Sequence, residues 1–105
     1  MLSSADNILC PTIVLYEVTK RIEQVHSRHA AMIAAAQLLR TRVVPLDAAL
    51  ATFAAHVSID HRLAMADAVV YATACTHTAT LVTSDAHLSG LPGVEYIPHP
   101  RRASG

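Results

Sequence analysis

Acidic residues are the part of this sequence where residue type and position point to chemistry. Asp67 lies in the run RLAMADAVVYATACT (62–76), in which the residues one helical turn away on either side are apolar or aromatic. An ionised carboxylate in such surroundings is costly unless it is paired, hydrogen-bonded or bound to a metal ion. No cationic residue in the neighbouring turns could pair with it. The alternatives are a narrow solvent-exposed stripe or an aspartate that caps a nearby loop.

Asp85 lies in the turn that follows the β-branched run TLVT (80–83), one residue after Ser84. One interpretation is that Asp85 caps the short turn 86–88, a role that aspartate fills well. The other depends on geometry. Helix 62–76 must run back over a sheet to reach strand 80–83, so the start of the helix and the end of the strand lie at the same sheet edge. Asp67, roughly 7 Å along the helix at ~1.5 Å per residue, and Asp85 would then face the same crevice.

Glu17 repeats this arrangement, because it lies in the second turn of a helix that follows the apolar run 8–10. A surface glutamate near a helix N-terminus is the ordinary alternative, since negative charge is favoured there. Three carboxylates at one sheet edge repel one another and are usually tolerated because a divalent cation neutralises them. All-oxygen ligands suit Mg²⁺ or Mn²⁺ better than zinc. These ions polarise phosphates, activate water and stabilise leaving oxygens, so the three residues point to phosphoryl chemistry.

The elements that must position these residues are short apolar runs separated by longer helical ones. The stripe formed by Val14, Val18, Ile22 and Val25 has helical spacing, and Asp47 is a candidate N-cap. The patterns predict strands over 8–10, 43–46, 80–83 and 94–97, and helices over 12–28, 29–39, 48–57 and 62–76.

Strands that alternate with helices predict an α/β fold: a parallel sheet with helices on both faces, in three layers. Functional residues in such folds gather beyond the carboxyl ends of the strands, which is where the acidic residues fall. The length of 105 residues fits one domain over 1–105, with a core over about 8–97 and a flexible tail over 98–105.

Composition narrows the functional classes. With 52% apolar and 15% charged residues, the chain can bury a core. Its 8 basic and 8 acidic residues exclude a surface that binds nucleic acid by charge alone. The sequence contains no GxGxxG, Walker A or GxSxG motif, so nucleotide binding and serine hydrolysis lack support. Two cysteines give no disulfide framework, and neither a signal peptide nor a membrane span is evident, so we expect a cytoplasmic location and no membrane partner.

The segments ILCPTIVLYEVTKRI (8–22), LAMADAVVYATA (63–74) and TLVTSD (80–85) resemble, in order and spacing, the successive motifs of PIN domains, in particular the VapC-type toxins of type II toxin–antitoxin systems. The resemblance covers about 8–97. It implies that Glu17, Asp67 and Asp85 are the catalytic acids that bind Mg²⁺ or Mn²⁺, and that Thr83 supplies a supporting hydroxyl. It also implies a metal-dependent endoribonuclease that cleaves structured RNA, a cognate antitoxin as partner, and homodimers, which are common in the family.

The sequence departs from the family pattern at its start. PIN domains begin with a strand that ends in Asp, usually followed by Thr or Ser, and then a first helix. This chain shows neither, and Asp6 does not follow a strand. We therefore expect an N-terminally incomplete PIN-like fold, because Met1 is a late start or because the chain is a degenerate paralogue. Without that central strand its neighbours cannot pair directly, which leaves a gap of about 4.8 Å per absent strand to close.

The sequence is compatible with two candidate functions. The first is the metal-dependent ribonuclease of the PIN and VapC type. The second is a catalytically inactive PIN-like interaction module that binds an antitoxin or a paralogous chain.

Overall fold

Short strands and longer helices alternate along the chain. A computed structural model describes residues 8–83 and 85–98. Asp6 and all of the predicted tail except Pro98 lie outside the described residues. The elements in chain order are β1 (Leu9–Pro11), α1 (Thr12–Val25), α2 (Arg28–Leu38), β2 (Arg42–Val44), α3 (Ala48–His61), α4 (Met65–Thr76), β3 (Leu81–Thr83), the short 3₁₀ turn η2 (Ala86–Leu88) and β4 (Val94–Tyr96). The predicted α/β class is confirmed.

Side-chain caps fix the starts of two helices. Asp47 caps α3 as predicted, because its Oδ1 accepts a hydrogen bond of 2.8 Å from the Leu50 N–H. Ser27 caps α2 by accepting 3.0 Å from the Ala30 N–H, which separates α2 from α1. These caps satisfy backbone donors that a helix start leaves unpaired.

The predicted helix over 62–76 starts too early. Arg62 has a left-handed backbone conformation, with φ 54° and ψ 50°, and ends α3. The Leu63 N–H then donates 3.0 Å back to the Ser58 carbonyl, a common way to close a helix C-terminus. A right-handed helix cannot continue through such a residue, so α3 extends to His61 and α4 begins only at Met65.

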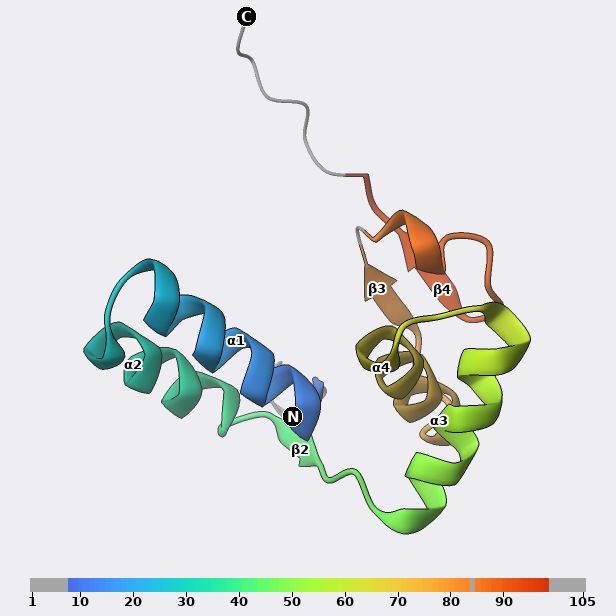
Figure 1. The fold of residues 1–105 in the computed structure, drawn as a ribbon, viewed down its shortest axis with the longest axis horizontal. Helices are drawn as coiled ribbons and strands as arrows, with labels where there is room; N and C mark the ends of the chain where they lie inside the picture. The colour runs from blue at the N-terminus through green and yellow to red at the C-terminus, as the bar shows by residue number, and fades with distance from the viewer. Residues whose placement is uncertain (1–7, 84, 99–105) are drawn as a thin grey trace, which may run out of the picture.

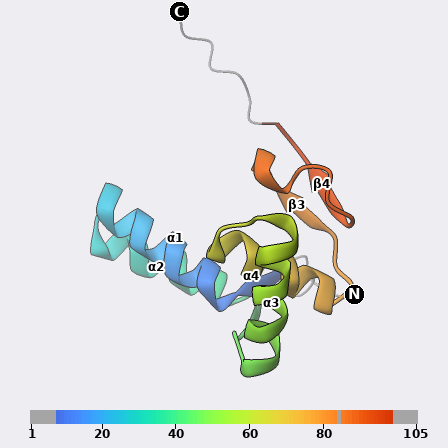
Figure 2. The same ribbon diagram turned by 45° about the vertical axis from the view of Figure 1, so that its right-hand side comes forward.

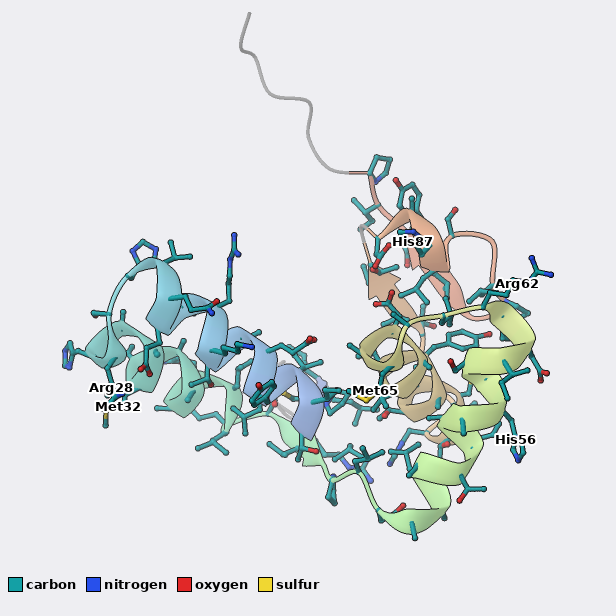
Figure 3. The ribbon with its side chains drawn as sticks, viewed as in Figure 1. Arg28, Met32, His56, Arg62, Met65 and His87 are labelled. Carbon is teal, nitrogen blue, oxygen red and sulfur yellow. The ribbon has the colours of Figure 1, made fainter. Side chains whose placement is uncertain are left out.

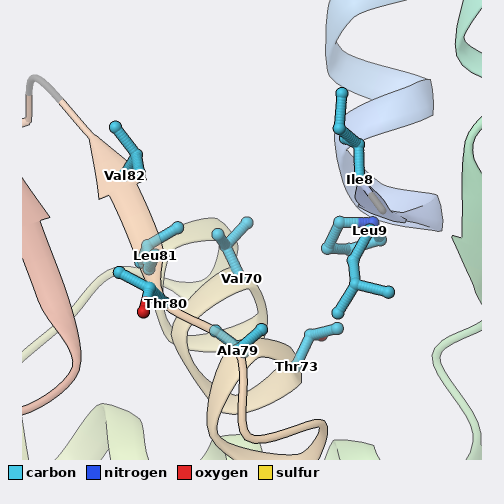
Figure 4. Close-up of a pocket in the computed structure, with 10 residues that line it drawn as sticks. Ile8, Leu9, Val70, Thr73, Ala79, Thr80, Leu81 and Val82 are labelled. Atoms are coloured by element: carbon cyan, nitrogen blue, oxygen red, sulfur yellow. The ribbon is translucent and has the colours of Figure 1, made fainter. Parts of the chain in front are cut away.

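The strands form two separate parallel sheets instead of one. β1 pairs with β2, with Leu9 opposite Arg42, and β3 pairs with β4, with Leu81 opposite Val94. Parallel pairing is as predicted, but no ladder joins β1 to β3 among the described residues. Between them lies a groove of about 320 Å³ lined by residues of both strands and of α4 (Figure 4). This groove separates the two sheets.

Helix α4 is the centre of the core. Its buried residues include Ala68, Val69, Tyr71 and Ala72, and it packs along α3. Helices α1 and α2 form an antiparallel hairpin that projects from the side of the molecule opposite β3 and β4 (Figures 1 and 2). No helix in the described part of the chain has both the length and the apolar composition to cross a membrane.

Candidate metal centre

Asp67 is held by the most buried helix of the molecule. It is the third residue of α4 and lies in the first turn, not in the second turn as predicted, because the helix begins at Met65. Ala68 and Val69, the next residues, are buried in the core. This anchoring leaves the half-buried Asp67 carboxylate fixed at the N-terminal end of α4, where a helix favours negative charge.

Asp85 caps η2, as one of its two interpretations predicted. Its Oδ1 accepts 2.9 Å from the His87 N–H, and the His87 Nδ1 lies 2.9 Å from the same oxygen. The Asp85 N–H in turn donates 3.0 Å to the Thr83 hydroxyl. Thr83 therefore fixes the backbone of Asp85, and His87 fixes its side chain.

The two aspartates lie together, and their pKa values move apart. Burial raises the pKa of Asp67, and the charge of Asp85 and a hydrogen bond with Asp85 raise it further. Hydrogen bonds from the His87 backbone and ring lower the pKa of Asp85. Asp85 therefore caps η2 and lies beside Asp67 at the same time, because its single carboxylate makes both contacts.

Glu17 contributes less to this cluster than the two aspartates do. Its exposed side chain lies in the second turn of α1, and its charge is the smallest of the contributions that raise the Asp67 pKa. Within the described ranges 8–83 and 85–98, no three His, Cys, Asp or Glu side chains are grouped so that they could hold a metal ion. Two facing carboxylates still fit Mg²⁺, which keeps several waters and is often bound by one or two carboxylates together with substrate phosphates.

A cavity of about 260 Å³ opens beside Asp67. Its walls are Arg62, Leu63, Ala64, Asp67 and His87. Figure 3 shows the side chains of Arg62 and His87 on different segments of the chain, one at the end of α3 and one in η2. The wall of the cavity thus contains two residues of basic type together with one member of the carboxylate pair, an arrangement suited to a phosphate and its counter-ion.

Sequence analysis missed both basic residues. The position of His87 two residues after Asp85 could have indicated a contact, because a capping aspartate receives the N–H of the residue two or three places on. Arg62 carried no such signal, because it was assigned as the first residue of the predicted helix 62–76. Its place in the cavity depends on the left-handed conformation that separates α3 from α4.

Comparisons with known proteins identify the family and the fold. Residues 1–94 match the PIN domain family. No curated protein sequence matches the chain significantly. Among solved structures, a toxin–antitoxin complex from Klebsiella pneumoniae contains a chain with a TM-score of 0.69 and 23% identity, over 81% of this chain and 69% of that one. The structural similarity shows a shared fold. Because the family match spans most of its length, the chain belongs to the PIN domain family, whose members are generally nucleases that use divalent metal ions.

Proposed function

We propose that this chain is a metal-dependent endoribonuclease that cleaves structured RNA. The observation that carries the proposal is the convergence of Asp67, from the first turn of α4, with Asp85, from the end of β3, beside an open cavity. A half-buried carboxylate next to a second carboxylate is costly without a cation. Membership of a family of nucleases supports the same chemistry.

The roles of the residues follow from their surroundings. Asp67 and Asp85 would hold Mg²⁺ or Mn²⁺, and Glu17 would add negative charge from α1. When bound, the ion supplies Lewis-acid polarisation of the phosphate and lowers the pKa of water. His87 orients the Asp85 carboxylate through its ring Nδ1, and Thr83 orients the Asp85 backbone.

The partner that we propose is a small antitoxin protein. The structural neighbour from Klebsiella pneumoniae is a toxin–antitoxin complex, which supports a toxin of the VapC type here. The hairpin of α1 and α2 exposes apolar side chains that such a partner could cover, among them Tyr16, Met32, Ile33 and Leu39. The same side chains could alternatively meet in a homodimer, and the mass of the purified chain in solution would distinguish the two.

Cleavage of a structured RNA by the purified chain tests the proposal. We expect cleavage with Mg²⁺ or Mn²⁺, none with excess chelator, and a loss of at least about 100-fold in Asp67→Asn and Asp85→Asn, because removal of even a supporting residue at a metal site costs 10–100-fold. Asp60→Asn is the matched control, since Asp60 is an exposed acid in α3. Equal cleavage by all of these variants would disprove the assignment of the site.

The inactive interaction module remains the second candidate. The observation that favours it is that no group of three potential ligands is assembled among the described residues. A folded chain that binds an antitoxin peptide, but neither binds Mn²⁺ at millimolar concentration nor cleaves RNA, would establish this function in place of the nuclease.

A further inference from the structure

One face of α1 carries Glu17 together with two cationic side chains. Lys20 and Arg21 come three and four residues after Glu17, so the three residues lie on one side of the helix, a single turn apart. All three are exposed, and so is Gln24, which lies one turn further along the same side. In Figures 1 and 2, α1 leads from beside α4 toward the free end of the hairpin. The two cations therefore lie on the outer surface of the hairpin, one turn beyond Glu17.

The charges of these two cations are not neutralised by the protein. Among the residues that the structure describes, neither Lys20 nor Arg21 forms an ion pair. The Lys20 Nζ lies 5.6 Å from the centroid of the Tyr16 ring, which attracts a cation without cancelling its charge. Arg28 differs, because its Nε and Nη2 bond to the Glu23 Oε2 at 3.1 and 2.9 Å. Lys20 and Arg21 thus remain free to bind an anion.

The same face is within electrostatic reach of the candidate metal centre. The charge of Glu17 acts on the pKa of Asp67. Lys20 and Arg21 follow Glu17 by roughly 4.5 and 6 Å along the helix axis, at ~1.5 Å per residue. Phosphates of one nucleic-acid strand in a duplex recur every ~3.4 Å along its axis. A strand with one phosphate at the aspartate pair would therefore bring neighbouring phosphates to the two cations.

A local pair of cations matters in this chain because the overall charge does not attract RNA. The 8 basic residues are balanced by 8 acidic ones. Attraction for a polyanion must then come from places where cations are exposed and unpaired. Charge complementarity and continuity with the aspartate pair favour the phosphates of a substrate strand as the anion that this face binds.

We propose that Lys20 and Arg21 bind backbone phosphates of the RNA substrate next to the bond that is cleaved, and so direct the substrate strand along α1. Contacts of this kind position the strand without reading its sequence. The inference deepens the proposed function and rests on it, because RNA is taken as the substrate. It adds binding residues that are separate from the carboxylates.

Binding of a fluorescently labelled RNA hairpin to the full chain tests the proposal. Anisotropy is measured in excess chelator at several KCl concentrations, so that the readout is binding and not cleavage. We expect Lys20→Gln/Arg21→Gln to weaken binding at least about tenfold at low salt. The slope of log K against log [KCl] should become shallower by about 1.4–1.8, the value for two lost phosphate contacts. Because Gln suits an exposed helix position as well as Lys and Arg do, the Tm should stay within about 3 °C.

Two further variants separate phosphate contacts from a general effect of charge. Arg28→Gln also removes a cation from the hairpin, but one that is already bonded to Glu23, and should change affinity by less than about twofold. Lys20→Arg/Arg21→Lys keeps both charges and should bind like the wild type. Equal weakening per charge by Arg28→Gln would overturn the proposal. An unchanged affinity and slope in the double Gln variant would also overturn it, and would leave this face to a protein partner.

Cleavage assays distinguish a failure of this inference from a failure of the proposed function. If the wild type binds RNA with the expected dependence on Lys20 and Arg21 but does not cleave it with Mn²⁺, the nuclease proposal is wrong and the phosphate contacts stand. If the double Gln variant cleaves RNA with an unchanged KM, the phosphate contacts are wrong and the nuclease proposal stands.

Discussion

Asp67 and Asp85 have identical side chains but opposite pKa shifts, because different groups surround the two carboxylates. Asp85 receives two hydrogen bonds from His87, which stabilise its ionised form. Asp67 is half-buried and faces the charge of Asp85, which favours its protonated form. Asp67 is therefore the member of the pair whose ionisation responds more to the loss of a neighbouring charge or to a bound cation.

Replacement of Asp67 by Asn separates a metal-binding role from a structural one. Removing one charge relieves repulsion and burial cost, so the Tm of the metal-free protein should stay constant or rise. The rise in Tm caused by millimolar Mn²⁺ in the wild type should disappear. Thermal melts with and without Mn²⁺ measure both effects. Asp47→Asn is the control, because Asn still caps α3 and the charge it removes lies outside the cluster. Destabilisation of metal-free Asp67→Asn by several kcal/mol would show that Asp67 has a structural partner.

The difference in Tm between Asp67→Asn and the wild type should increase as the pH rises. The pKa of Asp67 is raised in the folded state. Its stabilising contribution is therefore complete below the unfolded pKa and is lost as the pH rises through the folded pKa. The variant should match the wild type near about pH 3 and exceed it in Tm by about pH 7. Melts across this range in chelator are the measurement, and a difference that shrinks as pH rises would contradict the shift.

At the scale of elements, Arg62 shows how one backbone conformation positions the site. Its left-handed conformation ends α3 and lets α4 start at Met65, which places Asp67 in the first turn. Glycine is the usual residue at this position of a helix end. An arginine here bears a steric cost of about 1–2 kcal/mol, which is consistent with a functional reason to keep its side chain at the cavity.

Arg62→Gly should therefore stabilise the protein and weaken its action on RNA. Relief of the steric cost, less the entropy that glycine loses on folding, should raise the free energy of unfolding by about 0.5–1 kcal/mol. Loss of the Arg62 side chain from the wall of the cavity that Asp67 also lines should raise KM for RNA more than it lowers kcat. Urea unfolding and steady-state cleavage measure the two effects. Unchanged KM in a stabilised variant would assign Arg62 no role in substrate binding.

Tyr71 joins α4 to the segment before β4. Its ring is buried, and its hydroxyl donates 2.7 Å to the Pro92 carbonyl. Tyr71→Phe keeps the ring but leaves that carbonyl without this donor, so it should cost about 1 kcal/mol and lower the Tm by about 4–8 °C. Tyr16→Phe, at an exposed position on α1, is the control and should leave the Tm unchanged within about 1 °C. Equal Tm values for the two variants would refute this link.

At the scale of the whole molecule, the sequence predicted every strand and helix of the described chain to within a few residues. Hydrophobic periodicity and β-branched runs located α1, α2 and β3 close to their observed bounds. The proximity of Asp67 and Asp85 was also predictable, because chain direction in an α/β fold places helix starts and strand ends at one edge.

Other features depend on contacts that a linear pattern does not contain. The boundary at Arg62 rests on a backbone conformation that its residue type disfavours, so the sequence pattern placed a helix start at Arg62 where the structure has the end of α3. The roles of Arg62 and His87 in the cavity arise from the meeting of α3, α4 and η2. The position of Glu17 relative to the aspartate pair depends on how α1 packs on α4, and residue spacing in the sequence does not determine that packing.

The division of the sheet into two ladders has a consequence for cooperativity. One group of elements in contact consists of β1, β2, α1 and α2. A second group consists of α3, α4, β3 and β4. Among the described residues, the main contacts between the two groups are those of α4 with α1 and with β1. Such groups can open as separate units with different free energies. Tryptophan reporters at Tyr16 in the first group and Tyr96 in the second should therefore give urea midpoints that do not coincide.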